Sequence, residues 1–150
     1  MNLLDASANQ LKKQDADLIY KTAIKWEQLS TDITSTAQHM LEVHGDTQCL
    51  MNLSHEVQST VWSLAYLQFL TRISATVTHD DDEHIALFYT KQAIDIEQGK
   101  FVGKRQIVSG FAGVCHDEPV TAIKAQKILD LLDETARALR QVSAQINFGR

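Results

Sequence analysis

The chain has 150 residues, of which 44% are hydrophobic and 22% are charged, and its formal net charge is −5. This length fits one domain with a buried core, and the composition excludes a disordered chain. One proline and six glycines leave little of the turn-forming sequence that an all-β fold needs, and the acidic balance argues against nucleic-acid or anionic-membrane partners.

No segment is typical of export or of membrane insertion. Residues 1–7 lack the basic start and the apolar run of a signal peptide. The apolar run 61–70 is interrupted by polar residues and falls well short of the ~20 residues of a membrane span. Cys49 and Cys115 are too few for a disulfide framework. We therefore expect a soluble, cytoplasmic protein without a membrane partner.

The first predicted helix runs from about Asp15 to His44, because apolar residues recur along it at three- and four-residue steps. These residues are Ile19, Ala23, Trp26, Ile33, Ala37 and Met40. Gly45 is expected to end this helix, since glycine adopts the left-handed cap conformation without a steric cost. Asp46 then provides an N-cap for the next helix.

The second predicted helix continues to about Val77 and carries an unusual amount of apolar surface. Two of its faces are apolar: Val57, Val61 and Leu64 on one, and Trp62, Tyr66, Phe69 and Ile73 on the other. A helix that is apolar on all sides must be buried on all sides. Either this helix lies at the centre of the monomer, or its second face forms the seam of a homodimer. We favour the homodimer.

The third predicted helix takes Asp81 or Asp82 as its N-cap. It carries an apolar stripe as far as the Gly99 region, formed by Ala86, Tyr89, Ala93 and Ile96. Gly99 and Gly103 are expected to bend the helix, to end it or to permit close packing, and the pattern leaves these three alternatives open.

The last predicted helix lies within 117–148 and has the clearest pattern. Pro119 suits its first turn, and its inward residues recur with a period of about 3.5. They are Ile128, Leu132, Thr135, Leu139, Val142 and Ile146. Short connections favour antiparallel neighbours, so we predict an all-α fold of long antiparallel helices that form a four-helix bundle. This single domain divides into an N-terminal helix (1–45), a helical hairpin (46–110) and the C-terminal helix.

Near the start of the second helix, residues 52–56 have the sequence Asn-Leu-Ser-His-Glu. This segment resembles the phosphoacceptor motif of sensor histidine kinases, which has the form N-[LV]-S-H-E-[LI]-R-T-P-L and opens a long helix. Gln58, Ser59 and Thr60 depart from the Arg-Thr-Pro of that motif. The loss of proline matters less for the fold than for the mechanism, because a helix is more continuous without it.

A second segment strengthens the resemblance. Residues 93–101 have the sequence Ala-Ile-Asp-Ile-Glu-Gln-Gly-Lys-Phe, which is similar to the family's closing segment of the second hairpin helix, D-x-S-K-I-E-A-G-K-[LMF]. In that family two hairpins dimerise into one four-helix bundle. The two segments lie closer together here than in the family, by about three helical turns.

The resemblance implies that His55 accepts a phosphoryl group and exchanges it with the receiver domain of a response regulator or with a histidine kinase. It implies that Glu56 acts as general base and that Ser59 stands where the family orients water for dephosphorylation. The family's ATP-binding domain has no counterpart in this chain, and 99–104 is not a phosphate-binding loop pattern. We therefore expect a histidine phosphotransferase that needs no cofactor and is not an autonomous kinase.

The alternative is a non-enzymatic module that binds a partner protein. Most exposed histidines on helices have no catalytic role, so His55 alone does not decide between these functions. A phosphoacceptor domain that has lost its chemistry, or a bundle unrelated to signalling, would have the same composition and the same periodicity.

Two further groups of residues have metal-binding chemistry. In an up-and-down bundle, four zinc-compatible residues would share one end: His44, Cys49, Cys115 and His116. The tight ligand pairs of a structural zinc site are absent from the sequence, so we predict ordinary thiols and no metal site. The acidic run 79–84 is expected to be a solvated turn.

Overall fold

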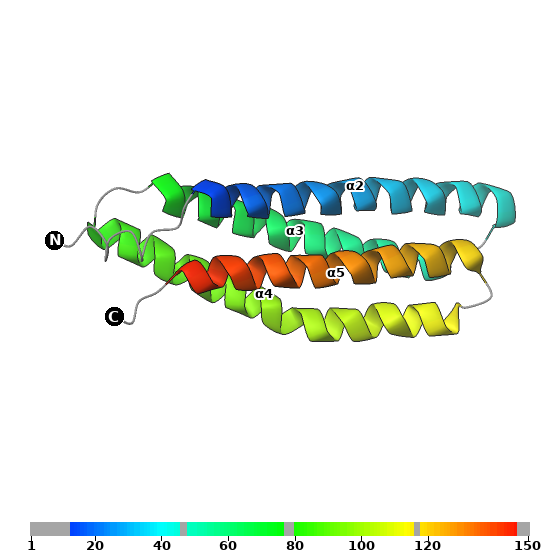
Figure 1. Ribbon diagram of the computed structural model, residues 1–150. Coiled ribbons are helices and arrows are strands. Elements are labelled where there is room, and N and C mark those ends of the chain that lie inside the picture. Colours follow the sequence, from blue (N-terminus) through cyan, green and yellow to red (C-terminus); the bar gives the residue numbers. More distant parts are fainter. Residues whose placement is uncertain (1–12, 46–47, 77–79, 116–117, 147–150) are drawn as a thin grey trace.

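The protein is described by a computed structural model that places residues 13–45, 48–76, 80–115 and 118–146. These residues form four helices, which are α2 (Lys13–His44), α3 (Gln48–Thr76), α4 (Asp80–Val114) and α5 (Pro119–Gln145). The helices lie along one another as an up-and-down bundle (Figure 1). Each helix packs against the next one in the chain, and α5 closes the ring on α2. The predicted all-α four-helix bundle is confirmed.

Within the described residues, none of the helices combines the length and the hydropathy that a membrane span requires.

The predicted helix ends agree with the structure at two points and differ at one. Gly45 ends α2 with a φ of 75°, and its N–H donates to the carbonyl of Leu41 at 2.9 Å. Pro119 is the first residue of α5. The α4 helix already begins at Asp80, so Asp81 and Asp82 lie in its first turn and not at its N-cap. The proposed cap at position 46 and the side chains of 80–84 lie outside the described residues.

The α4 helix runs through both of its first glycines and ends only at Val114. Gly99 and Gly103 therefore do not end the helix. Both are exposed, and among the described residues a methyl group at either position would meet no atom of another part of the chain within 4 Å. Close packing inside the monomer does not explain them.

The core is built from one stripe of each helix. The stripes predicted for α2 and α5 are buried, apart from the half-buried Met40, and Trp26 and Ile128 have no exposed surface. On α3 the buried residues follow a three–four repeat: Leu50, Leu53, Val57, Thr60, Leu64, Leu67, Thr71 and Ser74. One chain therefore supplies all four helices of the bundle, because α2 and α5 pack against the α3–α4 hairpin.

The second apolar face of α3 lies outside this core. Trp62 is 76% exposed, Tyr66 58%, Phe69 59% and Ile73 38%. The alternative that α3 is buried on all sides at the centre of the monomer is therefore wrong.

The stripe predicted for α4 is also wrong. Tyr89 and Ile96 are more than half exposed. The buried stripe lies elsewhere on the helix and consists of Leu87, Thr90, Ile94, Glu97, Phe101, Lys104 and Val108. Because this buried stripe contains three polar residues, hydrophobic periodicity alone favoured the exposed side of α4 that carries Tyr89 and Ile96.

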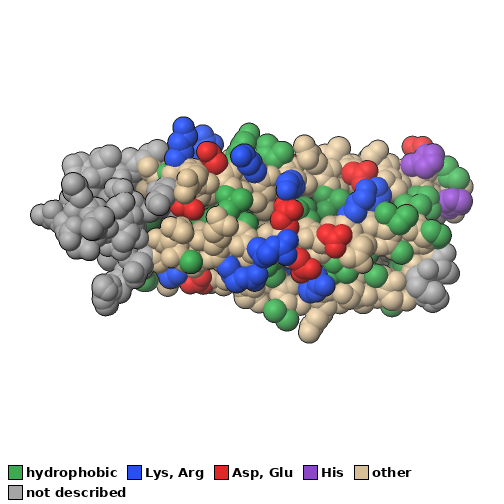
Figure 2. All heavy atoms as spheres, in the orientation of Figure 1, with side chains coloured by type: hydrophobic (Ala, Val, Ile, Leu, Met, Phe, Trp, Pro, Cys, Tyr) green, Lys and Arg blue, Asp and Glu red, His purple; other side chains and the backbone are tan. Residues whose placement is uncertain are grey.

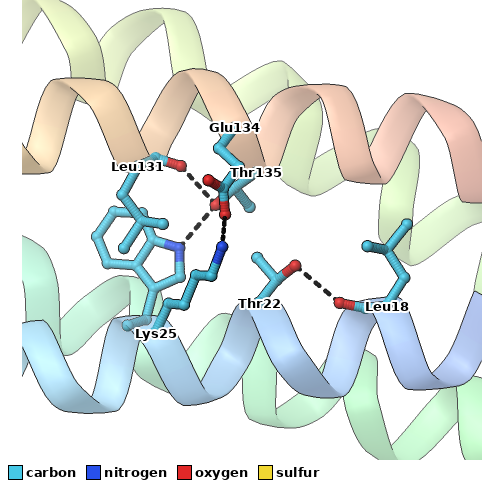
Figure 3. A network of polar contacts seen from close by, with 7 residues as sticks. Leu18, Thr22, Lys25, Leu131, Glu134 and Thr135 are labelled. Carbon is cyan, nitrogen blue, oxygen red and sulfur yellow. Dashed lines mark hydrogen bonds and ion pairs between the residues drawn. The ribbon is translucent and has the colours of Figure 1, made fainter.

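Polar contacts join α2 to α5 through the core (Figure 3). The indole N–H of Trp26 donates to Oγ1 of Thr135 at 2.8 Å, and the Thr135 hydroxyl donates to the carbonyl of Leu131 at 2.6 Å. At the surface above them, Lys25 pairs with Glu134 at 2.6 Å. The one polar atom of the buried tryptophan is thus satisfied, as burial requires.

Cys49 and Cys115 form a disulfide, with their Cα atoms 6.4 Å apart. The prediction of ordinary thiols is therefore wrong. In an antiparallel hairpin, residues that face each other keep a constant sum of residue numbers. Two other contacts between α3 and α4, Thr60 with Lys104 and Ser74 with Thr90, have the same sum as the cysteine pair. The antiparallel register of the hairpin is thus uniform along its length, and it places the two cysteines opposite each other.

Candidate functional site around His55

His55 is exposed on α3, about two turns after the start of the helix. It lies on the rim of a groove between α2 and α3 with a volume of about 340 Å³. The groove is lined by Thr34, Ala37, Gln38 and Leu41 of α2 and by Met51, Ser54, His55 and Gln58 of α3. Figure 2 shows histidine side chains over the end of the bundle at which α2 ends and α3 begins.

The groove beside His55 combines apolar walls with hydroxyl groups. Leu41 is 53% exposed and Met51 is 42% exposed, so each offers apolar surface to a partner. Across the groove, the hydroxyls of Thr34 and Ser54 are hydrogen-bonded at 3.3 Å. This contact ties α3 to α2 directly beside the histidine. The imidazole is therefore reachable from solvent while the backbone that carries it is anchored.

Of the other two predicted site residues, Ser59 lies on the same side of α3 as His55 and Glu56 does not. Ser59 is exposed and follows one turn later, so both side chains lie on the same side of α3. Glu56 is half-buried. Burial lowers the pKa of Lys104 on α4, and the negative charges of Glu97 and then of Glu56 oppose that shift. No hydrogen bond joins Glu56 to His55 among the described side chains.

A buried polar cluster lies between α3 and α4, next to the position of Glu56. Lys104 Nζ donates to Oγ1 of Thr60 at 2.9 Å and lies 3.8 Å from Oε1 of Glu97. Burial lowers the pKa of Lys104, and the carboxylate of Glu97 opposes that shift. Sequence reasoning missed this cluster, although Thr90, Glu97 and Lys104 recur every seven residues and thus share one face of the helix.

The cysteine pair also has a carboxylate beside it. The sulfurs of Cys49 and Cys115 and a carboxylate oxygen of Glu118 lie within 4.8 Å of one another. Sulfurs joined in a disulfide carry no thiolate charge, so the oxidised pair is a poor metal ligand. His44 is not part of this group, and His116 lies outside the described residues.

Comparison of the chain with protein-family models, with curated proteins and with solved structures finds no significant match.

Proposed function

We propose that this protein is a histidine phosphotransferase whose phosphoacceptor is His55. A ring nitrogen of His55 attacks the phosphorus of an aspartyl phosphate on a receiver domain. The bond between phosphorus and the aspartate oxygen breaks, a phosphoramidate forms, and the aspartate leaves as a carboxylate. The reverse reaction passes the phosphoryl group on, and a histidine kinase is the alternative donor. An imidazole is nucleophilic near neutral pH, so the step needs no cofactor.

The exposure of His55 on the rim of an anchored groove is the observation that carries this proposal. Transfer between proteins requires that the imidazole reach the active site of a partner. The exposed Leu41 and Met51 provide the apolar contacts that a helix of the partner would need for docking. The resemblance of 52–56 to the phosphoacceptor motif supports the same residue.

The position of Glu56 bears on whether the site also catalyses dephosphorylation by water. Glu56 is half-buried and makes no hydrogen bond to His55 among the described side chains, so we do not assign it the role of base for the imidazole. Phosphoryl transfer tolerates this arrangement because the neutral imidazole is itself the nucleophile. We expect dephosphorylation by water to be slow, since Ser59 alone remains to orient the water.

Replacing His55 by glutamine is expected to abolish phosphorylation of the chain. The protein is incubated with a phosphorylated receiver domain or with a histidine kinase and labelled ATP, and the label is followed on a denaturing gel. A phosphoramidate is lost in acid and survives in base. His39→Gln and His44→Gln are matched controls, because both histidines are exposed on α2 and should leave the label unchanged. Label that persists in His55→Gln would contradict the proposal.

This function places the protein in the cytoplasm, where the disulfide would be unusual. Cytosolic thiols are kept reduced, and disulfides that form there are mostly redox-sensing. We therefore expect the Cys49–Cys115 disulfide of the structure to be reversible, reduced in resting cells and formed under oxidative stress. Trapping with an alkylating reagent, followed by mass spectrometry of the two cysteine peptides, measures this directly. A chain that is fully oxidised in resting cells would argue for an oxidising compartment and against phosphotransfer.

The competing function is that of a non-enzymatic module that binds a partner protein. The apolar walls of the His55 groove favour it, because they offer a docking surface whether or not phosphate is transferred. The labelling experiment with His55→Gln, extended by a measurement of partner binding, distinguishes the two functions. A module binds a receiver domain or a kinase equally well in the wild type and in His55→Gln, and neither form acquires label.

A further inference from the structure

The outer face of α3 carries a second helix-packing stripe. Its exposed residues Trp62, Tyr66, Phe69 and Ile73 follow one another at steps of four, three and four residues. This is the spacing with which one helix contacts another helix in a coiled coil. The buried stripe of α3 has the same repeat on the opposite side of the helix. The helix thus has the pattern to pack on two sides, and the described residues bury only one of them.

The outer face offers apolar surface with little charge. No charged residue occurs on α3 between Glu56 and Arg72. On α4, Lys91 and Asp95 both bind Ser143 of α5 and so are directed away from α3. Arg72 and Lys100 also line grooves on this face, and both are exposed. A partner would therefore cover apolar side chains and meet two cations beside them, as in an interface with an apolar core and a polar rim.

The α4 helix extends this face. Tyr89 and Ile96 line a groove of about 420 Å³ together with Trp62 and Tyr66 of α3. We name as the outer face seven of the exposed apolar residues of the hairpin: Trp62, Tyr66, Phe69, Ile73, Ile85, Tyr89 and Ile96. At about 150–250 Å² for each aromatic side chain and somewhat less for isoleucine, their exposed fractions amount to roughly 800 Å². One partner contributes about this area to a standard protein interface.

The outer face is complementary to itself. The uniform register of the hairpin places Ile96 of α4 level with the midpoint between Tyr66 and Phe69 of α3. Along α4, Tyr89, Ile96 and Gly103 follow one another at intervals of seven residues and so lie in one line. A two-fold axis at the level of Ile96 would therefore place the ring of Tyr89 in one copy over Gly103 of the other.

The same axis pairs the residues of α3 with one another. An antiparallel pair of α3 helices would bring Trp62 of one copy against Ile73 of the other, and Tyr66 against Phe69. Each contact then occurs twice, as the symmetry of a two-fold dimer demands. Among the described residues, a Cβ at Gly99 or Gly103 would meet nothing within 4 Å, so both provide space that the aromatic side chains of a second copy would fill.

We propose that a second copy of this chain covers the outer face, with α3 antiparallel to α3 and a two-fold axis at Ile96. This arrangement leaves the candidate site accessible. His55 lies roughly 19 Å along α3 from the axis, at 1.5 Å per residue, and the residue that would oppose it lies beyond the end of the other α3. The dimer and the proposed phosphotransfer are therefore independent of each other.

Sedimentation equilibrium of the full chain at micromolar concentration tests the dimer. We expect a mass of twice 16.8 kDa for the wild type. Tyr66→Lys should sediment as a monomer, because it places a charge next to the axis. Ile123→Lys is the matched control: Ile123 is 57% exposed on α5, so the same change there should leave the dimer intact.

Gly103→Leu tests the proposed packing separately from charge. Leucine favours the helix, so the monomer should unfold at the same or a higher temperature, whereas the dimer should dissociate at least about tenfold more readily. His55→Gln should remain dimeric, which separates this proposal from the phosphotransfer proposal. A wild type of 16.8 kDa at these concentrations overturns the dimer, as does a dimer that survives both Tyr66→Lys and Gly103→Leu. A monomer that binds neutral lipid vesicles through Trp62 would assign the outer face to a membrane instead.

Discussion

Replacing Lys104 by methionine is expected to lower the free energy of unfolding by about 3 kcal/mol at neutral pH, because the change leaves a buried carboxylate without its buried partner. Glu97 is only 5% exposed, and its Oε1 accepts no hydrogen bond from the described residues. Lys100 lies 3.7 Å from its Oε2 and provides partial compensation, so the lower end of the usual range applies. Urea denaturation followed by circular dichroism measures the difference.

Two further variants show whether the loss comes from the unpaired charge. Glu97→Leu combined with Lys104→Met should restore most of the stability, since a well-packed apolar pair often equals a buried ion pair. Lys100→Met is the matched control on the same helix. Its ammonium is more than half exposed, and its loss should cost less than about 1 kcal/mol. A double variant as unstable as Lys104→Met would mean that packing, and not charge, caused the loss.

The same lysine gives the stability a pH dependence of known sign. Burial lowers the pKa of Lys104 from its ordinary value of 10.5 in the folded chain, whereas the unfolded chain keeps that value. Between the two values the unfolded state binds more protons, so the free energy of unfolding rises with pH. Relative to Lys104→Met, the wild type should therefore gain stability as the pH increases toward 10.5. A difference that stays constant through this range would contradict the lowered pKa.

Reducing the Cys49–Cys115 disulfide is expected to lower the free energy of unfolding by about 4 kcal/mol. The bond closes a segment with a sequence separation of 66 residues, and it thereby limits the conformations of the unfolded chain. A loss of this size is a large fraction of the stability of a small domain. It would also release the start of α3, which carries the candidate site, from the end of α4.

Thermal and urea unfolding with and without a thiol reductant measures this effect. A chain with both Cys49→Ala and Cys115→Ala is the control, because its stability should not respond to the reductant. If the reduced wild type is as stable as the oxidised one, the disulfide does not stabilise the fold. The equal stability would then indicate that the cysteine pair senses oxidation and is not a structural bond.

Much of the fold follows from local properties of the sequence. Gly45 and Pro119 mark helix ends because their backbone restrictions act wherever they occur. The stripes of α2 and α5 were predicted correctly because most of their inward residues are apolar and their buried polar residues are mainly small. On α4 the buried stripe includes Glu97 and Lys104, whose burial depends on partners far away in the sequence. Hydrophobic periodicity therefore selected the wrong face.

The candidate site also has a part that the sequence could predict and a part that it could not. A local motif made His55 the candidate, and the structure places its side chain exposed on α3. The groove beside it could not be predicted, because Leu41 reaches it from another helix. Nor could the half-buried position of Glu56, since it depends on how α3 packs against its neighbours.

The sequence by itself determined four helices, one of them with apolar residues on two sides, and most of their approximate ends, although not the end of α4 at Val114. These follow from backbone preferences and from residue spacing, which act over a few residues. Only the tertiary structure decided which side of α3 the chain covers and that Cys49 meets Cys115. Both depend on the register between antiparallel helices, which is set by the packing of side chains that are distant in the sequence.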